Sequence, residues 1–186
     1  CWRRTDYTRS CMTCNWYRNR EHFDSCGKET AGDIHMTEFV TDHFKLAQIC
    51  QSGQCFRMKA EGENRYRVIA GKRCLELEQQ GQRCRFECDK EEFDEFWKEY
   101  FDLEADYGFY TGQVAGTDNY LRNAAEFGAG IRILRQDLWE MIVSFLISQQ
   151  NHILRIRRCI ENICTEYGEK LEDGQGKAYH AFPTPQ

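Results

Sequence analysis

The chain has 186 residues, of which 41% are hydrophobic and 13% aromatic, and its formal net charge is −5. This length accommodates one domain or two small ones, and the apolar content supports a packed core. The negative charge excludes a generally basic nucleic-acid-binding surface, although a local basic patch can still contact DNA.

Cysteine usage and hydropathy point to a reducing environment. The chain contains 11 cysteines, and this odd count excludes a disulfide framework that pairs every cysteine within one chain. The N-terminus shows no apolar signal segment, and no run approaches the length of a membrane-spanning helix. We expect reduced, buried cysteines in an intracellular protein of the cytoplasm or nucleoid, or of the nucleus if the source is eukaryotic.

Residues 1–35 show neither helical nor strand periodicity. We interpret them as a disordered extension, or as a segment outside the native protein, which would then begin at Met36. A zinc site is the alternative, with ligands from Cys11, Cys14, Cys26 and one of Cys1, His22 or His35. Structural zinc sites usually combine two ligand pairs, and only one CxxC is present, so the prediction is no metal and no cofactor.

The stretch after Met36 has the pattern of an antiparallel sheet. Ser52 and Gly53 mark a tight backbone feature ahead of a strand. Polar and apolar residues then alternate over residues 65–69, 75–78 and 84–88, with glycine-containing turns between these runs. The pattern predicts a β-meander with one solvated face.

Helical periodicity follows the predicted sheet. Asp89 can cap a helix, with Glu92 at the capping-box spacing. Aromatic residues form a stripe that we expect to cover the sheet: Phe93, Phe96, Trp97, Tyr100 and Phe101. Residues 103–116 are expected to be irregular, and a short helix over residues 120–127 should begin at Asp118 and end at Gly128.

Residues 135–158, RQDLWEMIVSFLISQQNHILRIRR, predict two helices separated by a polar break. Asp137 and Glu140 have capping-box spacing at the start of the first helix. Its predicted buried face consists of Leu138, Met141, Ile142 and Phe145. This face stays exposed if the helical domain lacks its partner helices. The second helix is expected to bury Ile153, Ile156, Ile160, Ile163 and Cys164, to present Arg155, Arg158 and Asn162 on its polar face, and to end near Gly168.

The polar break, Ser148-Gln149-Gln150-Asn151, admits two interpretations. It is either an ordinary solvated turn of a helical hairpin, or a bend suited to entering a nucleic-acid duplex. The beginning of a helix and nearby arginines favour contact with phosphate. The pattern of residues by itself leaves both interpretations open.

Three stretches together resemble the 8-oxoguanine DNA glycosylase family: SGQCFRM at 52–58, GIRILRQDLWEMIVSFLISQQNHILRI at 130–156, and YHAFPTPQ at 179–186. The resemblance covers residues 37–186. It implies an α+β protein with an antiparallel β domain, similar to half of a TATA-binding protein, over residues 36–117. An incomplete all-α helix-hairpin-helix glycosylase domain follows over residues 118–186.

The resemblance implies base-excision repair by a bifunctional glycosylase and lyase. In the family, the catalytic Lys and Asp lie after the hairpin motif, beyond the matched stretches, so no catalytic residue is assigned here. Lys170 and Lys177 both precede that motif. The proline-containing tail suggests a chain cut short, which we expect to be inactive alone and to carry the lesion-reading half.

The family assigns lesion-base recognition to the turn matched by Gly53, with Gln54 and Phe56 beside it. The glycine carbonyl accepts a hydrogen bond from N7–H of 8-oxoguanine. Guanine has an acceptor at N7, whereas oxidation at C8 places a proton there. Opposing the carbonyl with an acceptor costs about 1–3 kcal/mol, which favours the lesion.

The family also assigns DNA contacts to the polar bend. Gln150 matches the residue that fills the space left by the flipped base. Asn151 matches the next position and is expected to cap the second helix. Arg155 matches the arginine that contacts the orphaned cytosine. His152 stands where relatives tend to have Asn, and it either alters a DNA contact or faces solvent.

The expected partner is double-stranded DNA containing 8-oxoguanine opposite cytosine, bound by a monomer with no membrane association. Two alternatives remain open at this point. The first alternative to the glycosylase is a damaged-DNA-binding module without chemistry. The second is a zinc-stabilised interaction protein built on Cys11 and Cys14.

Overall fold

The structure, a computed structural model, describes residues 35–114 and 118–185. The described residues belong to one compact unit, Ile34–Gln186. The zinc candidates from Cys1 to Cys26 lie outside the described residues. So does the segment 115–117, next to which the sequence predicts a domain boundary.

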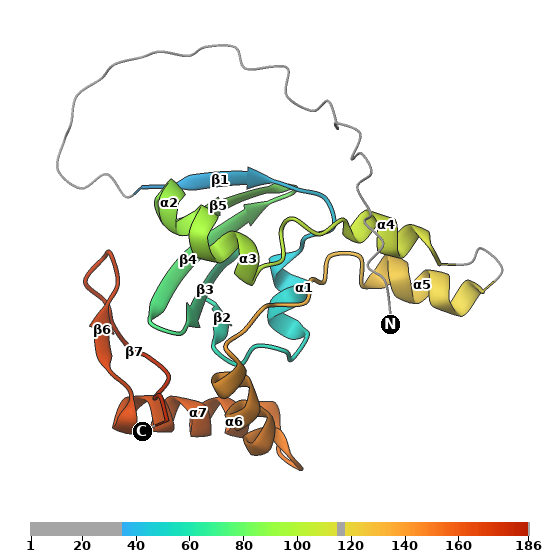
Figure 1. Cartoon of the computed structure of the whole chain (residues 1–186). Helices are drawn as coiled ribbons and strands as arrows, with labels where there is room; N and C mark the ends of the chain where they lie inside the picture. Colours follow the sequence, from blue (N-terminus) through green and yellow to red (C-terminus); the bar gives the residue numbers. More distant parts are fainter. Residues whose placement is uncertain (1–34, 115–117, 186) are drawn as a thin grey trace, which may run out of the picture. The chain divides into compact units, whose positions relative to one another are not determined.

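The β-rich part is a five-stranded antiparallel sheet with strand order β1-β5-β4-β3-β2 (Figure 1). Its strands are β1 (Thr37–Val40), β2 (Met58–Ala60), β3 (Arg65–Ala70), β4 (Arg73–Gln80) and β5 (Arg83–Phe86). The predicted meander corresponds to β3, β4 and β5 and is confirmed. The sequence did not indicate β1, because four residues are too few to show a clear alternation.

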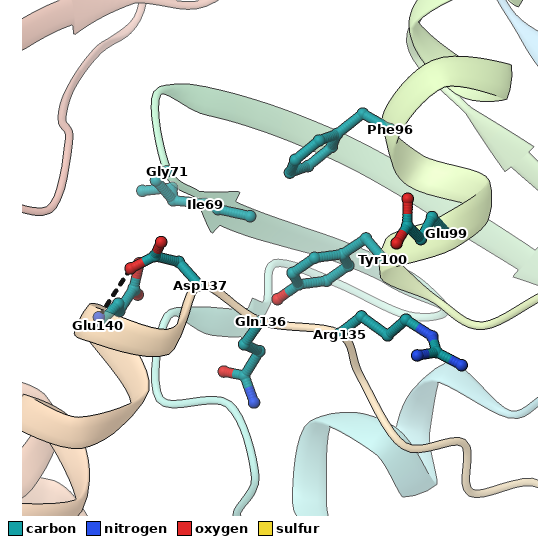
Figure 2. A pocket seen from close by; sticks show the side chains of 10 residues that line it. Ile69, Gly71, Phe96, Glu99, Tyr100, Arg135, Gln136, Asp137 and Glu140 are labelled. Carbon is teal, nitrogen blue, oxygen red and sulfur yellow. Dashed lines mark hydrogen bonds between the residues drawn. The ribbon is translucent and has the colours of Figure 1, made fainter. Parts of the chain in front are cut away.

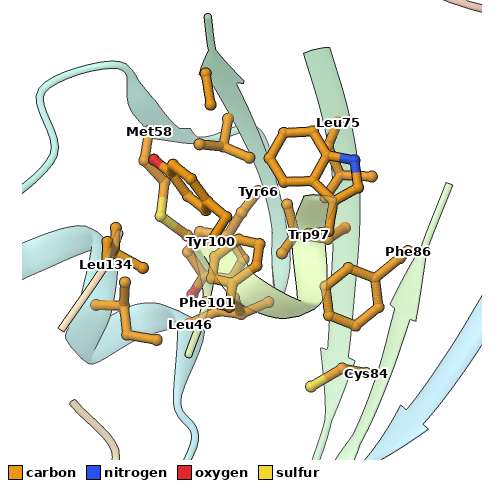
Figure 3. Close-up of a cluster of buried hydrophobic side chains, with 14 of the residues drawn as sticks. Leu46, Met58, Tyr66, Leu75, Cys84, Phe86, Trp97, Tyr100, Phe101 and Leu134 are labelled. Carbon is orange, nitrogen blue, oxygen red and sulfur yellow. The ribbon is translucent and has the colours of Figure 1, made fainter. Parts of the chain in front are cut away.

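Aromatic side chains from one helical stretch cover the inner face of the sheet (Figure 3). This stretch consists of α2 (Lys90–Glu92), the π-helical turn η1 (Phe93–Trp97) and α3 (Lys98–Tyr100). Trp97 and Phe101 are fully buried, and the Phe86 and Phe93 rings lie 4.9 Å apart, centroid to centroid. The predicted covering stripe is therefore confirmed, as is the Asp89 cap, whose carboxylate accepts from the Glu92 N–H.

Helix α1 (Leu46–Gln51) packs on the same core through Leu46 and Ile49, both fully buried. The cysteines in the described residues are free, and each is buried or half-buried: Cys50, Cys55, Cys74, Cys84, Cys88, Cys159 and Cys164. All seven are free, and the predicted burial is confirmed for five of them: Cys50, Cys55, Cys84, Cys88 and Cys164. Apolar burial also raises the pKa of the Cys84 and Cys88 thiols to about 12, which keeps them protonated.

Four further helices follow: α4 (Tyr107–Gly112), α5 (Asn119–Phe127), α6 (Leu138–Ser148) and α7 (Ile153–Tyr167). Asp118 and Asp137 cap α5 and α6 through their carboxylates, as predicted. Helix α4 lies where an irregular segment was expected. Its own cap, Asp106, accepts from the Phe109 N–H and offsets three glycines nearby that weaken the helical pattern.

The apolar face of α6 is exposed in the described chain, so of the two expectations for it the one based on missing partner helices applies. Leu138 and Phe145 are 64% and 63% exposed, and Met141 and Ile142 are each 44% exposed. Periodicity identifies which face of a helix is apolar but not what covers it. On α7, Ile156, Ile160 and Cys164 are buried as predicted, whereas Ile153 is 43% exposed.

The C-terminal segment forms a second, two-stranded sheet of β6 (Lys170–Glu172) and β7 (Ala178–His180). The hairpin contacts the outer face of the five-stranded sheet, where Arg67 and Asp173 form a buried ion pair of 2.7 Å. None of the helices in residues 35–114 and 118–185 has the length and apolar character needed to cross a membrane.

Candidate nucleic-acid interface

The 52–54 turn, formed by Ser52, Gly53 and Gln54, follows the end of α1. The Ser52 hydroxyl donates to the Ile49 carbonyl over 2.7 Å and closes the last turn of the helix. Gly53 has φ +79°, and a Cβ built there would meet no atom within 4 Å. Glycine is thus required by the left-handed backbone rather than by lack of space. Within the described residues, no hydrogen bond occupies the Gly53 carbonyl.

Gln54, which was predicted to contact the lesion, has both ends of its side-chain amide bonded to the chain. Its Nε2 donates to the Arg132 carbonyl over 2.7 Å, and its Oε1 accepts from the Leu134 N–H over 2.9 Å. The Gln54 carbonyl in turn accepts from Gln136 Nε2 over 2.6 Å. In this structure, Gln54 therefore fastens the turn to the segment that enters α6.

Phe56, the third predicted recognition residue, is half-buried. It packs against a small apolar cluster formed by Ile156, Ile160, Cys164 and Phe182. Phe56 thereby joins the segment between the 52–54 turn and β2 to α7 and to the C-terminal segment. Cys55, between Gln54 and Phe56 in the sequence, is buried, and its sulfur lies 3.6 Å from the Tyr100 hydroxyl. Burial raises the pKa of both the Cys55 thiol and the Tyr100 hydroxyl.

A buried charge pair links the residues after the turn to the first turn of α6. Arg57 Nη1 lies 3.9 Å from Glu140 Oε1, and both side chains are almost fully buried. Arg57 also donates to the His180 carbonyl. Burial raises the pKa of Glu140 to about 7, although Arg57 acts in the opposite direction. The sequence marked Glu140 only as a capping residue, because burial of this kind has no local signature.

A cavity of about 310 Å³ lies between α3 and the start of α6 (Figure 2). It is lined by Ile69, Ala70, Gly71, Phe96, Glu99, Tyr100, Arg135, Gln136, Asp137 and Glu140. None of the seven predicted site residues lines it. Figure 2 shows the Asp137 carboxylate directed at the backbone N–H of Glu140, and this bond measures 2.9 Å. The cavity therefore borders the N-terminal end of α6 and is separate from the residues predicted to contact DNA.

The 149–152 bend, from Gln149 to His152, joins α6 to α7. Gln150 is exposed and has φ +50°, a left-handed conformation that non-glycine residues rarely adopt. Asn151 instead bonds internally, since its Nδ2 donates to the Ile147 carbonyl over 3.1 Å and its Oδ1 accepts from the His152 N–H over 3.0 Å. Gln150 is thus presented to solvent at this bend, as are Gln149 and His152, and it alone of these three has a left-handed φ.

The predicted capping role of Asn151 differs from the structure. The N-cap of α7 is His152, whose side chain is exposed and makes no capping hydrogen bond. Asn151 lies one residue earlier and stabilises the bend instead. Without a side-chain cap, the first N–H groups of α7 remain open to an anionic partner. Arg155, in the first turn of α7, is also exposed and can reach a partner at the same helix end.

Comparisons with known proteins identify the family of the chain. Residues 37–142, more than half of the chain, match the family model for the "8-oxoguanine DNA glycosylase, N-terminal domain". The chain belongs to the 8-oxoguanine DNA glycosylase family. The resemblance stated from the sequence motifs, and the α+β fold class that it implies, are confirmed.

Similar proteins within and around the family include one curated enzyme and one solved bacterial structure in two states. The N-glycosylase/DNA lyase of Saccharomyces cerevisiae is 44% identical over 57 residues, which cover 31% of this chain and 15% of that protein. The 8-oxoguanine glycosylase/lyase of Clostridium acetobutylicum, in complex with double-stranded DNA containing cytosine opposite 8-oxoguanine, is 42% identical with a TM-score of 0.72. This match covers 77% of this chain and 49% of that one.

The apo form of the same Clostridium acetobutylicum enzyme is 39% identical with a TM-score of 0.74, covering 81% of this chain and 55% of that one. The chain therefore spans about half the length of the solved glycosylases it matches. Within the part of the chain that the structure describes, no group of three or more His, Cys, Asp and Glu side chains is placed to hold a metal ion.

Proposed function

We propose that this chain is the lesion-reading part of an 8-oxoguanine DNA glycosylase and lyase that acts in base-excision repair. The proposed substrate is 8-oxoguanine opposite cytosine in double-stranded DNA, bound by a monomer in the compartment that holds the genome. The observation that carries the proposal is the 52–54 turn. It presents an unoccupied Gly53 carbonyl in a conformation that favours glycine, in a chain of this family.

Gly53 suits the discrimination of 8-oxoguanine from guanine. A carbonyl held in one direction can accept only from a donor, and 8-oxoguanine carries a proton at N7 where guanine carries a lone pair. Because Gly53 has no side chain, the base can approach its backbone closely. The mismatch between two acceptors costs about 1–3 kcal/mol, or roughly 5- to 150-fold in affinity.

The 149–152 bend suits the distortion that exposes the base. A base inside the stack cannot be reached, so its place has to be filled when it is flipped out. Gln150 is the exposed, left-handed residue at the bend, and we assign it to the vacated space. We assign Arg155 to the orphaned cytosine, whose acceptors match a guanidinium fork. Asn151 and His152 shape the start of α7, where a DNA phosphate can bind.

The chemistry of the proposed reaction needs a Lys nucleophile that attacks the sugar C1′ and forms a Schiff base. No lysine of this chain is assigned to that role. Lys177 is ion-paired with Glu61 at 3.2 Å, and Lys170 lies on the edge hairpin β6–β7. We therefore assign lesion binding, and not cleavage of the glycosidic bond, to the described residues.

The test is equilibrium binding of the 186-residue chain to duplexes with 8-oxoguanine opposite cytosine or opposite adenine. Arg155→Ala is expected to weaken binding opposite cytosine by about tenfold, because one bidentate base contact contributes about 1–3 kcal/mol. Binding opposite adenine should fall by less. Arg158→Ala, which removes another exposed arginine of α7, is the matched control and should affect both duplexes alike.

Two results would contradict the proposal. Equal losses opposite cytosine and adenine for Arg155→Ala would remove its role at the orphaned base. A wild-type chain that binds damaged and undamaged duplexes equally would remove lesion recognition itself.

A further inference from the structure

Three glutamine side chains in the described chain bridge a carbonyl and a nearby N–H of another segment. Gln79 bridges the Phe44 carbonyl (2.6 Å) and the Leu46 N–H (2.8 Å). Gln48 bridges the Phe127 carbonyl (2.6 Å) and the Gly130 N–H (2.9 Å). Gln54 bridges the Arg132 carbonyl (2.7 Å) and the Leu134 N–H (2.9 Å). A primary amide supplies one donor and one acceptor side by side, as a neighbouring strand does. Each bridge therefore joins two segments that are distant in the sequence, and the segment held by Gln54, residues 131–137, has no regular secondary structure of its own.

The bridge made by Gln54 is anchored at both ends. Its own carbonyl accepts from Gln136, so three hydrogen bonds join residue 54 to the 132–136 segment. Arg132, whose carbonyl accepts one of them, is itself buried. Its guanidinium donates to the Asp102 carbonyl over 2.6 Å and to the Ala105 carbonyl over 3.0 Å. The 132–136 segment, to which Gln54 is hydrogen-bonded, is thus also fixed to the loop that follows α3.

We propose that Gln54 is a positioning residue that aims the Gly53 carbonyl at the lesion. This inference rests on the proposed function of Gly53. The Gly53 carbonyl belongs to the peptide unit that joins Gly53 to Gln54, and that unit is planar. Fixing residue 54 at its side chain and at its carbonyl therefore restricts the direction of the Gly53 carbonyl, which has no hydrogen bond of its own within the described residues.

The same bridge couples the 52–54 turn to the 149–152 bend. The segment held by Gln54 leads directly into Asp137, the cap of α6, and α6 ends at the bend that carries Gln150. The spacing between the residue that recognises the lesion and the residue that fills its place is then set by one helix. Gln54 acts on specificity through this geometry and makes no contact with the base.

The test compares Gln54→Met with Gln48→Met in the 186-residue chain. Both substitutions remove a two-bond glutamine bridge from a half-buried position on the same connecting region, so both should lower the thermal midpoint to a similar extent. The readout is the ratio of dissociation constants for undamaged and 8-oxoguanine-containing duplexes that are otherwise identical. A purely structural role would change the midpoint but leave this ratio unaltered.

We expect Gln54→Met to lower the ratio by about five- to tenfold, the effect of roughly one net hydrogen bond, while binding to the undamaged duplex stays constant. Gln48→Met should keep the wild-type ratio within about twofold. If Gln54→Met does not fold, Gln136→Met carries the test, because it removes only the bond to the Gln54 carbonyl. It should lower the ratio by a smaller factor.

The outcomes separate this inference from the function on which it rests. Two outcomes overturn the positioning role alone. In the first, Gln54→Met keeps the wild-type ratio. In the second, Gln48→Met lowers the ratio as much as Gln54→Met does. A wild-type ratio of one overturns the proposed function and the positioning role together.

Discussion

The two ends of α6 are held in opposite ways. At its start, Asp137 caps the helix, Glu140 is buried against Arg57, and Gln136 bonds to the carbonyl of Gln54. At its end, Gln150 is exposed in a left-handed conformation. The side-chain hydrogen bonds of the bend there go to its own residues and to the last turn of α6.

This difference corresponds to two tasks in the proposed reaction. Telling 8-oxoguanine from guanine depends on a carbonyl that cannot turn away from an unfavourable partner, so that end needs many fixed contacts. Entering a duplex requires a side chain that exchanges solvent for base edges as the DNA deforms, which an exposed bend permits. The N-terminal end of α6 is fixed to the rest of the protein, so the length and direction of α6 determine the position of the 149–152 bend.

The largest expected effect tests the anchored end. Glu140→Gln should remove a pH dependence of stability, because the pKa of Glu140 is raised from 4.5 to about 7 by burial. The folded state binds more protons than the unfolded state in that window, so the wild-type free energy of unfolding should fall as pH rises from 5 to 8. The contribution of Glu140 to this fall is about 3 kcal/mol, measured by urea unfolding.

Glu161→Gln is the matched control for this prediction. Glu161 is exposed and pairs with Lys59 at the surface, so its replacement should leave the slope of stability against pH unchanged. If Glu140→Gln retains the wild-type slope, the first turn of α6 is more solvated than the structure shows, and the contrast between the two ends weakens.

An intermediate effect is expected in the 52–54 turn. Gly53→Ala should lower the free energy of unfolding by about 1–2 kcal/mol, because an alanine at φ +79° is strained although space is open. It should also reduce the preference for the lesion as the backbone relaxes. Gly62→Ala is the control, since Gly62 has open space and no left-handed φ, and its stability should stay constant or rise slightly.

Urea unfolding measures both glycine variants. Equal stability changes for Gly53→Ala and Gly62→Ala would mean that the turn is not constrained by its backbone conformation. Unaltered lesion preference in a destabilised Gly53→Ala would separate the strain at Gly53 from recognition.

The smallest effect is expected at the free end of α6. Gln150→Gly should raise the free energy of unfolding by about 0.5–1 kcal/mol, because it relieves the left-handed strain at φ +50°. Affinity for damaged DNA should nevertheless fall, since the filling side chain is gone. Gln149→Gly, at φ −61°, relieves no strain and should lower stability instead. A lower free energy of unfolding for Gln150→Gly would contradict this prediction, because the Gln150 side chain would then stabilise the bend.

The anchoring contacts also show where sequence reasoning ends. The caps at Asp89, Asp118 and Asp137 were predicted correctly, because each depends on a carboxylate and an N–H three residues away. The glutamine bridge of Gln54 joins residues about eighty positions apart, and no local pattern marks it. The resemblance supplied Gly53 as a candidate, and its role in recognition stays a proposal. The structure adds its left-handed φ and a carbonyl without a hydrogen bond among the described residues.

The exposed apolar face of α6 shows the complementary limit. Leu138, Met141 and Phe145 follow a helical period, and that period predicts a helix correctly. Burial depends on a partner surface, which the period does not contain. Glu140 is the converse case. A charged residue in a first turn suggests exposure, whereas Glu140 is buried against Arg57, a distant residue in the segment that precedes β2.

The central claim is that the Gly53 carbonyl recognises the proton at N7 of the lesion. The most direct measurement is binding of the wild-type chain to three duplexes that differ at one base opposite cytosine: guanine, 8-oxoguanine, and 8-methoxyguanine, which keeps an oxygen on C8 but has no proton on N7. We predict that 8-methoxyguanine binds as weakly as guanine, about tenfold or more below 8-oxoguanine. Binding of 8-methoxyguanine as tight as that of 8-oxoguanine would contradict the claim.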